Sequence, residues 1–222
     1  MGTLLLVRHG QASFGATDYD VLSDTGAEQA RLLGRWWARS GVTADLVIHG
    51  TQRRQRDTAA RIAEAAGWST ALVEEPGWSE FDYEHVVRAV TPGRPLPTEH
   101  KAFQDLFEVA LERWVAGGHV DDYPETYASF VGRVHAALDR ARTSADRGRT
   151  VVVVSSGGPI AAVAAHLIDP LADPAALSRA WRRLNVVVVN SSYSRIGVSV
   201  NGPRLLTYNE HSHLPPALLT YR

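Results

Sequence analysis

The stretch TLLLVRHGQ, residues 3–11, indicates the fold of this chain. Its apolar run, residues 4–7, is typical of a buried strand in a parallel sheet. Arg8 and His9 follow the run directly, and Gly10 marks its end. Polar side chains at the carboxyl end of such a strand lie where open α/β sheets bind their ligands. The stretch therefore predicts an α/β fold with a candidate site that begins at Arg8.

The segments outward from this stretch alternate between strand and helix patterns. We expect further strands at residues 44–49, 70–74, 150–156, 184–190, 194–200 and 204–208. One helix is expected to open with a capping box at residues 25–28 and to stop at Gly41, with Trp37 in the core. A second helix is expected at 53–66, ended by Gly67, and a third after Gly157, with Pro159 in its first turn.

The stretch between about residues 76 and 145 has a different pattern. No strand is evident there, and helices are expected near 99–116 and 125–145. We interpret this stretch as a helical cap insertion. The whole pattern predicts a single three-layer α/β/α domain over residues 1–222, with a mainly parallel central sheet and this helical cap.

The composition argues against several classes of function. The 222 residues are 45% hydrophobic and 21% charged, with a net charge of -1, whereas nucleic-acid-binding proteins are usually basic. The absence of cysteine removes disulfides, thiolate nucleophiles and cysteine zinc sites. The apolar run near the N-terminus is too short for a signal peptide or a membrane span. We expect a cytoplasmic protein with no nucleic-acid or membrane partner, and the oligomeric state stays open.

Polar side chains follow four of the expected strands. They comprise Arg8, His9 and Gln11 after the first, Arg54 after the second, Glu80 and Asp82 after the third, and residues 155–158 after the fourth. Guanidinium groups clamp phosphate oxygens, and the N–H groups at a helix start favour an anion. A neutral imidazole beside them can act as a nucleophile. The set predicts phosphoryl transfer without a metal or cofactor.

The same residues resemble a known family. Leu6-Val7-Arg8-His9-Gly10-Gln11 is similar to the signature of the histidine phosphatase superfamily, also called phosphoglycerate mutase-like. The resemblance continues in order through most of the chain, at Leu22-Ser23 with Gly26, Gln29 and Ala30, at Arg54 with Thr58-Ala59, at Glu80, at residues 153–158 and at residues 209–214.

This resemblance implies roles for the matching residues. His9 would attack phosphorus and become a phosphohistidine, while Arg8 and Arg54 would hold the phosphate oxygens. Glu80 would protonate the leaving oxygen and then accept a proton from the attacking water. The resemblance implies a small phosphorylated substrate. Asp82 is the alternative acid, and Gln11 and Gly157 are candidate phosphate-binding residues.

Ser156 departs from the family pattern, in which this position usually holds a second histidine that binds phosphate. A serine donates one hydrogen bond but carries no positive charge. The loss of a charge-assisted bond costs roughly 1–3 kcal/mol, or about one to two decades in rate. We expect Ser156 still to bind phosphate because the Gly-Gly frame after it is intact. His49 and Arg53 are candidates to supply the missing charge.

Three functions are compatible with this sequence. The first is a metal-independent phosphatase that hydrolyses phosphomonoesters through a phosphohistidine at His9. The second is phosphoglycerate mutase-type phosphotransfer, which is less favoured because residues 12–15 do not match the mutase pattern after the signature. The third is a non-catalytic module that binds phosphorylated ligands, which the serine at position 156 would favour.

Overall fold

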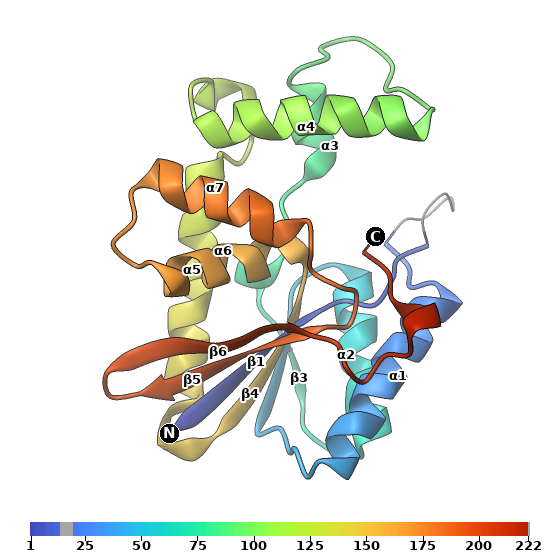
Figure 1. Cartoon of the computed structure of the whole chain (residues 1–222), viewed down its shortest axis with the longest axis vertical. Helices are drawn as coiled ribbons and strands as arrows, with labels where there is room; N and C mark the ends of the chain where they lie inside the picture. The colour runs from blue at the N-terminus through green and yellow to red at the C-terminus, as the bar shows by residue number, and fades with distance from the viewer. Residues whose placement is uncertain (14–19, 222) are drawn as a thin grey trace. The chain divides into compact units, whose positions relative to one another are not determined.

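A mixed sheet organises the larger part of the structure (Figure 1), a computed structural model that describes residues 1–13 and 20–221. Within these residues, six strands pair in the order β3-β2-β4-β1-β5-β6. They are β1 (Gly2–Arg8), β2 (Leu46–His49), β3 (Leu72–Glu74), β4 (Thr150–Ser155), β5 (Tyr193–Ser199) and β6 (Gly202–Glu210). β3, β2, β4 and β1 are parallel to one another, whereas β5 pairs antiparallel with both β1 and β6. The expected mainly parallel sheet is confirmed.

The register of the sheet brings three strand ends together. β4 lies between β1 and β2, and Arg8 pairs with Ser155 while His49 pairs with Val154. The backbone N–H of His9 donates to the Ser155 carbonyl at 2.9 Å. The carboxyl ends of β1, β4 and β2 are therefore neighbours, which is where an open α/β sheet binds ligands.

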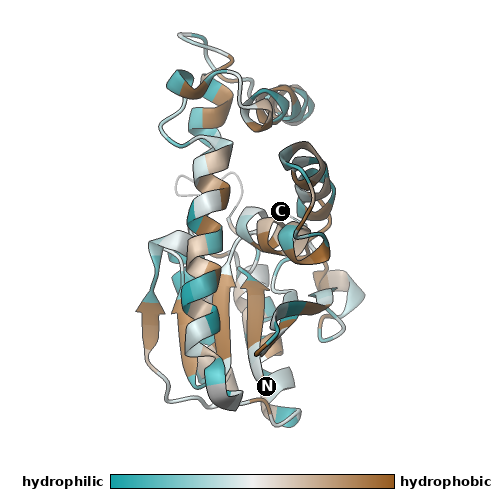
Figure 2. Ribbon diagram, turned by 90° about the vertical axis from the view of Figure 1, so that its left-hand side faces the viewer, coloured by the Kyte–Doolittle hydropathy of each residue, from teal (hydrophilic) through white to brown (hydrophobic). Residues whose placement is uncertain are grey.

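Helices cover both faces of this sheet. They are α1 (Asp24–Arg39), α2 (Arg53–Ala66), α6 (Gly157–Ile168) and the C-terminal half of α5 (Tyr127–Ser144), while α7 (Pro174–Asn185) packs on α6. α1 and α2 pack against each other and α2 contacts β2, β3 and β4, whereas α6 contacts β1 and β6. Successive side chains of a strand point to opposite faces, so strands buried on both faces consist of continuous apolar runs. Figure 2 shows parallel strands of the sheet in the hydrophobic colour along most of their length.

The core between the sheet and α1 and α2 is a single apolar cluster. Its buried members are Leu5, Val7, Ala30, Leu33, Trp37, Val47, Ala59, Ile62, Val152, Val154 and Tyr193. The expected core position of Trp37 is confirmed, because this side chain is 1% exposed and stacks on Trp68 with ring centroids 5.6 Å apart. This cluster fixes α2 against the strand ends that carry the candidate site.

Residues Phe81–Arg133 form a second compact unit. It contains α3 (Tyr83–Arg88), α4 (His100–Ala116) and the start of α5. The helices expected near 99–116 and 125–145 correspond to α4 and α5, whereas α3 was not predicted. The ring of Phe81 lies 4.8 Å from that of Trp114 and 5.6 Å from that of Phe130, measured between centroids. The unit is narrower than the insertion expected at about 76–145, because residues 76–80 and 134–145 belong to the unit that contains the sheet.

The start of α1 differs from the expected capping box. Ser23 is the N-cap, and its hydroxyl accepts from the Gly26 N–H at 3.0 Å, so the helix begins at Asp24. Glu28 forms ion pairs with Arg31 and Arg35 instead of returning to the backbone. The expected stop is confirmed, because Gly41 follows the helix with φ +68°.

The strand predicted at 184–190 is wrong. Residues 174–185 form α7, which begins with Pro174 after the N-cap Asp173. The valines that follow are not in a strand, although Val188 and Val189 are buried. The Asn209 amide takes the place of a strand partner, because it donates to the Val187 carbonyl at 2.7 Å and accepts from the Val189 N–H at 2.8 Å.

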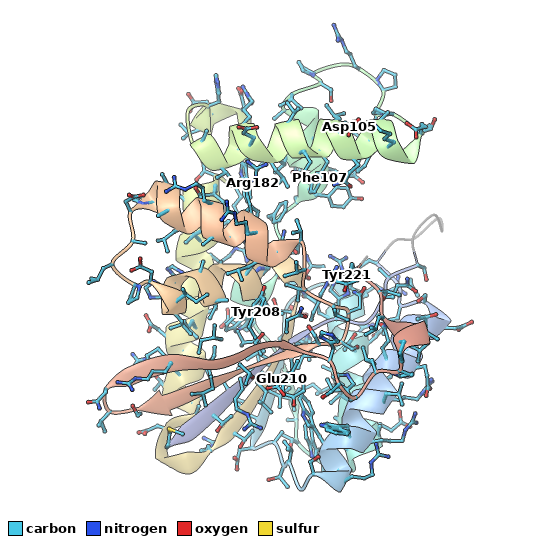
Figure 3. The ribbon with its side chains drawn as sticks, in the orientation of Figure 1. Asp105, Phe107, Arg182, Tyr208, Glu210 and Tyr221 are labelled. Carbon is cyan, nitrogen blue, oxygen red and sulfur yellow. The ribbon has the colours of Figure 1, made fainter. Side chains whose placement is uncertain are left out.

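The C-terminal hairpin fixes the end of α7. Tyr208 of β6, labelled in Figure 3, donates its hydroxyl hydrogen to the Leu184 carbonyl at 2.9 Å. The hairpin corresponds to the strands predicted at 194–200 and 204–208. Among the described residues, no helix combines the length and the hydrophobicity that crossing a bilayer requires.

Candidate active site

His9 follows β1 and is 5% exposed. Its Nδ1 lies 2.7 Å from the Gly10 carbonyl oxygen. A carbonyl oxygen only accepts, so Nδ1 carries the hydrogen and Nε2 of the neutral ring holds the lone pair. The Asn190 amide donates to the His9 carbonyl at 3.2 Å, which fixes the backbone from the other side. The local structure therefore leaves the lone pair of the neutral ring on Nε2.

The surroundings of His9 favour its neutral form. Burial lowers the pKa of His9 well below the ordinary value of 6.5, and the positive charges of Arg54 and Arg8 lower it further. The bond to the Gly10 carbonyl opposes these effects. Loss of solvation and nearby cations both disfavour an imidazolium ion. The His9 ring is therefore neutral at neutral pH, with its hydrogen on Nδ1 and its lone pair on Nε2.

Arg54 makes direct contact with His9. The Arg54 Nε–H donates to His9 Nε2 at 3.1 Å, and its terminal nitrogen is 2.7 Å from Asp20 Oδ1. Arg54 lies in the first turn of α2, where Thr58 donates to the Arg54 carbonyl at 2.7 Å and accepts from the Gly10 N–H at 3.0 Å. Thr58 thus ties the Arg54 turn to the loop that holds His9.

The predicted residues on either side of His9, Arg8 and Gln11, contact other parts of the chain. The guanidinium of Arg8 donates to the Val188 carbonyl, and its charge acts on His9. The side-chain oxygen of Gln11 accepts from the Ser23 hydroxyl at 2.9 Å, at the start of α1.

Glu80 follows β3 in the chain, and its side chain contacts the first turn of α6. Its Oε2 accepts from the Gly158 N–H at 3.1 Å, a position where the helix dipole favours a carboxylate. Gln52, the N-cap of α2, accepts from the Glu80 N–H at 3.2 Å, and its amide nitrogen is 3.5 Å from the Glu80 carbonyl oxygen. Asp82, the alternative acid, instead caps α3 by accepting from the His85 N–H at 3.1 Å.

Ser156 and Gly157 connect β4 to α6. The Ser156 hydroxyl is 1% exposed and accepts from the Gln55 amide of α2 at 2.8 Å. Gly157 is packed so closely that a Cβ there would lie 2.6 Å from the side-chain oxygen of Asn185. Two successive residues of α2 therefore contact the ends of two neighbouring strands, because Arg54 bonds to His9 and Gln55 bonds to Ser156.

Sequence reasoning missed four polar residues of this region, namely Asp20, Gln52, Gln55 and Asn190. The sequence holds one signal for two of them, because Gln52 and Gln55 are three residues apart at a helix start, the spacing of a capping box. The Gln52 N–H indeed lies 3.3 Å from the Gln55 side-chain oxygen. Asp20 and Asn190 come from distant loops, so no local pattern could have identified them.

One further prediction concerns His49, a candidate for the charge missing at position 156. His49 ends β2, is buried, and donates from Nδ1 to the Gly50 carbonyl at 2.7 Å, as His9 does to Gly10. Another histidine, His211, bonds through Nδ1 to the Asn209 carbonyl at 2.6 Å. Within the described residues, no three histidine or carboxylate side chains are grouped so that they could hold a metal ion.

Comparison with solved structures shows the same fold at low identity. A phosphoglycerate mutase from Bacillus anthracis str. Sterne is 19% identical, with a TM-score of 0.66 over 96% of this chain and 94% of that chain. A phosphoserine phosphatase variant from Entamoeba histolytica, solved with phosphoserine, is 18% identical, with a TM-score of 0.66 over 97% and 100%. A mycobacterial glucosyl-3-phosphoglycerate phosphatase, solved with VO3, is 22% identical, with a TM-score of 0.67 over 94% and 99%.

Sequence comparison identifies the family. A search of curated proteins gives no match. The family model described as histidine phosphatase superfamily (branch 1) matches residues 4–211, nearly the whole chain. These residues include β1 with His9, the start of α2 with Arg54, and the β4–α6 junction. The structural neighbours of the chain include phosphatases and a mutase. The chain therefore belongs to branch 1 of the histidine phosphatase superfamily.

Proposed function

We propose that the protein hydrolyses small phosphomonoesters, without a metal, through a phosphohistidine intermediate on His9. The observation that carries this proposal is the state of His9. Its ring is neutral, its tautomer leaves the lone pair on Nε2, and this atom lies 3.1 Å from Nε of Arg54. A nucleophile beside a guanidinium is the combination that in-line attack on an anionic phosphoryl group requires.

In the first step, the substrate phosphate replaces His9 as the acceptor of the Arg54 Nε–H. His9 Nε2 then attacks phosphorus, the N–P bond forms and the P–O ester bond breaks. Glu80, as a carboxylic acid, transfers its proton to the leaving oxygen, which departs as an alcohol. The positive charges of Arg8 and Arg54 stabilise the charge that develops on the phosphoryl oxygens.

In the second step, a water molecule attacks the phosphohistidine. The Glu80 carboxylate accepts a proton from this water, the new P–O bond forms and the N–P bond breaks. Inorganic phosphate leaves, and His9 and Glu80 regain their initial protonation states. Two contacts support this double role of one carboxylate, because the Gly158 N–H holds the Glu80 side chain and Gln52 holds the Glu80 backbone.

The remaining phosphate contacts are assigned by the same proposal. The Gly157 N–H and the Ser156 hydroxyl donate from the start of α6, where the helix dipole favours an anion. Gln11 donates from its NH2 group, since its oxygen already accepts from Ser23. A cytoplasmic location of the protein is part of this proposal.

The test is hydrolysis of p-nitrophenyl phosphate in the presence of EDTA, by the wild type and by His9→Ala. The proposal predicts activity in the wild type and a loss of at least about 10³-fold in the variant, because no other side chain replaces the nucleophile. Activity that survives in His9→Ala would overturn the assignment of His9. Wild-type activity that requires a bisphosphorylated primer would instead indicate a mutase.

A further inference from the structure

We propose that Gln55 is a positioning residue, which turns the hydroxyl hydrogen of Ser156 toward the phosphoryl group of the substrate. Gln55 and Ser156 together would then act as a neutral hydrogen-bond donor at the position where the family pattern has a histidine. This inference rests on the proposed function, which identifies the acceptor as a phosphoryl group. The contact between Gln55 and Ser156 itself does not depend on whether the protein turns over a substrate.

The orientation of the Gln55 amide is fixed by its two backbone partners. The Trp78 carbonyl can only accept, so the Gln55 nitrogen, 3.3 Å away, faces it. The Gln52 N–H can only donate, so the Gln55 oxygen, 3.3 Å away, faces that group. The amide therefore cannot be flipped without breaking both bonds.

The direction of the bond to Ser156 follows from this orientation. Because the Gln55 nitrogen lies 2.8 Å from the Ser156 oxygen, Gln55 is the donor and the serine hydroxyl is the acceptor. The hydroxyl hydrogen of Ser156 is not used in this bond. Within residues 1–13 and 20–221, no atom accepts a hydrogen bond from it, although the residue is 1% exposed and Gln55 is fully buried.

A buried donor without an acceptor is costly, and helix capping does not resolve it here. Ser156 occupies the N-cap position of α6, where a serine usually accepts from the first turn of the helix, yet its side chain makes no such bond. Gln55 uses one lone pair of the hydroxyl oxygen, and the hydroxyl hydrogen needs an acceptor that the described part of the chain does not supply. An anion oxygen would satisfy this need.

The place of Ser156 identifies that anion as the phosphoryl group. The residue follows β4, whose last carbonyl bonds to the His9 N–H at 2.9 Å. Two residues later, the Gly158 N–H bonds to Glu80. Ser156 therefore lies along the chain between the residue that contacts the proposed nucleophile and the one that contacts the proposed acid. Arg54 and Gln55 reach His9 and Ser156 from the same helical turn.

The experiment is a double-mutant cycle with Gln55→Met, Ser156→Ala and the two combined. Methionine keeps the length of the side chain and its helix propensity but cannot donate. Binding of orthovanadate, which has the shape of phosphate, is measured by calorimetry, and kcat and KM are measured with p-nitrophenyl phosphate. Each single variant is expected to weaken vanadate binding about tenfold, the size of one hydrogen bond to a charged group, and the double variant should lose no more.

Three results would overturn the inference: an unchanged affinity in Gln55→Met, losses that multiply in the double variant, and no binding of vanadate by the wild type. If Gln55→Met does not fold, Gln55→Glu replaces it in the cycle, since its carboxylate can still accept from Gln52 but cannot donate to Ser156. If the wild type binds vanadate and shows this coupling but does not use His9, the inference holds and the proposed function is wrong. If turnover passes through His9 without the coupling, the proposed function holds and the inference is wrong.

Discussion

At the scale of single residues, His9 depends on contacts from several parts of the chain. Gly10 fixes its tautomer, and Arg54 and Arg8 add to the effect of burial on its pKa. The sequence predicted that His9 and Arg54 belong to one site, because both follow strands of a mainly parallel sheet. It could not predict that Asp20 pairs with Arg54 at 2.7 Å, since this contact depends on how a distant loop folds back.

We expect an NMR titration of nitrogen-15-labelled protein to show His9 as the neutral Nδ1–H tautomer at pH 6.5, with its transition well below that value. Arg54→Gln removes a positive charge and should raise the pKa of His9 toward its ordinary value. Arg56→Gln is the matched control, because Arg56 is exposed on the same helix and pairs with Asp57. A His9 that titrates near 6.5 in the wild type would show that this description of its surroundings is wrong.

At the scale of elements, the loop after β1 fits against the start of α1 without space for side chains. A Cβ on Gly10 would lie 2.3 Å from the Gly26 carbonyl oxygen, and one on Gly26 would lie 2.1 Å from the Gln11 carbonyl oxygen. This close approach places the His9 loop. It also gives a physical reason for Gly26, which the sequence showed only as part of a pattern.

Gly26→Ala is therefore expected to destabilise the protein by about 2 kcal/mol, since the added methyl group meets backbone that must move. Gly132→Ala is the control, because Gly132 is also helical and has open space around it. That variant should be more stable by about 0.5–1 kcal/mol, from helix propensity alone. Chemical denaturation measures both, and equal effects of the two substitutions would contradict the close packing at Gly26.

Other elements show where sequence patterns are sufficient. The helix at 53–66 was predicted to the residue, because Gly67 ends it in the left-handed conformation. The segment at 184–190 was wrong because an apolar run indicates burial and not the partner that satisfies its backbone. Here the partner is the side chain of Asn209, which lies about twenty residues further along the chain.

At the scale of the whole molecule, histidines buried in the neutral state make stability depend on pH. Burial lowers the pKa of His213 to about 4 from 6.5. Above about pH 6.5 the ring is neutral in both the folded and the unfolded state. Below that value the unfolded chain binds a proton that the folded protein does not, so this residue lowers stability progressively between pH 6.5 and about 4.

Replacing His213 with leucine should remove that contribution. Lowering the pH from 8 to 5 should reduce the free energy of unfolding by about 2 kcal/mol less in His213→Leu than in the wild type. Urea denaturation at the two pH values measures this difference. The same loss in both proteins would mean that His213 accepts a proton in the folded state.

The fold class and the family were within reach of the sequence, as was the position of His9 at the end of a buried strand. The exact limits of the second unit were not, because helical periodicity does not say which residues of a long helix belong to which core. α5 is the example, since its first seven residues belong to the unit Phe81–Arg133 and the rest to the unit with the sheet.

The central claim is that the phosphoryl group passes through His9. It is tested most directly by mass-spectrometric peptide mapping of Glu80→Gln after mixing with p-nitrophenyl phosphate and an alkaline quench. p-Nitrophenolate leaves without a proton, so the first step survives in this variant, whereas hydrolysis is slowed because the base is missing. We predict a phosphoryl group on the peptide that contains His9, and none in the Glu80→Gln/His9→Ala double variant. A phosphoryl group on another residue, or none while the wild type turns over, would contradict the mechanism.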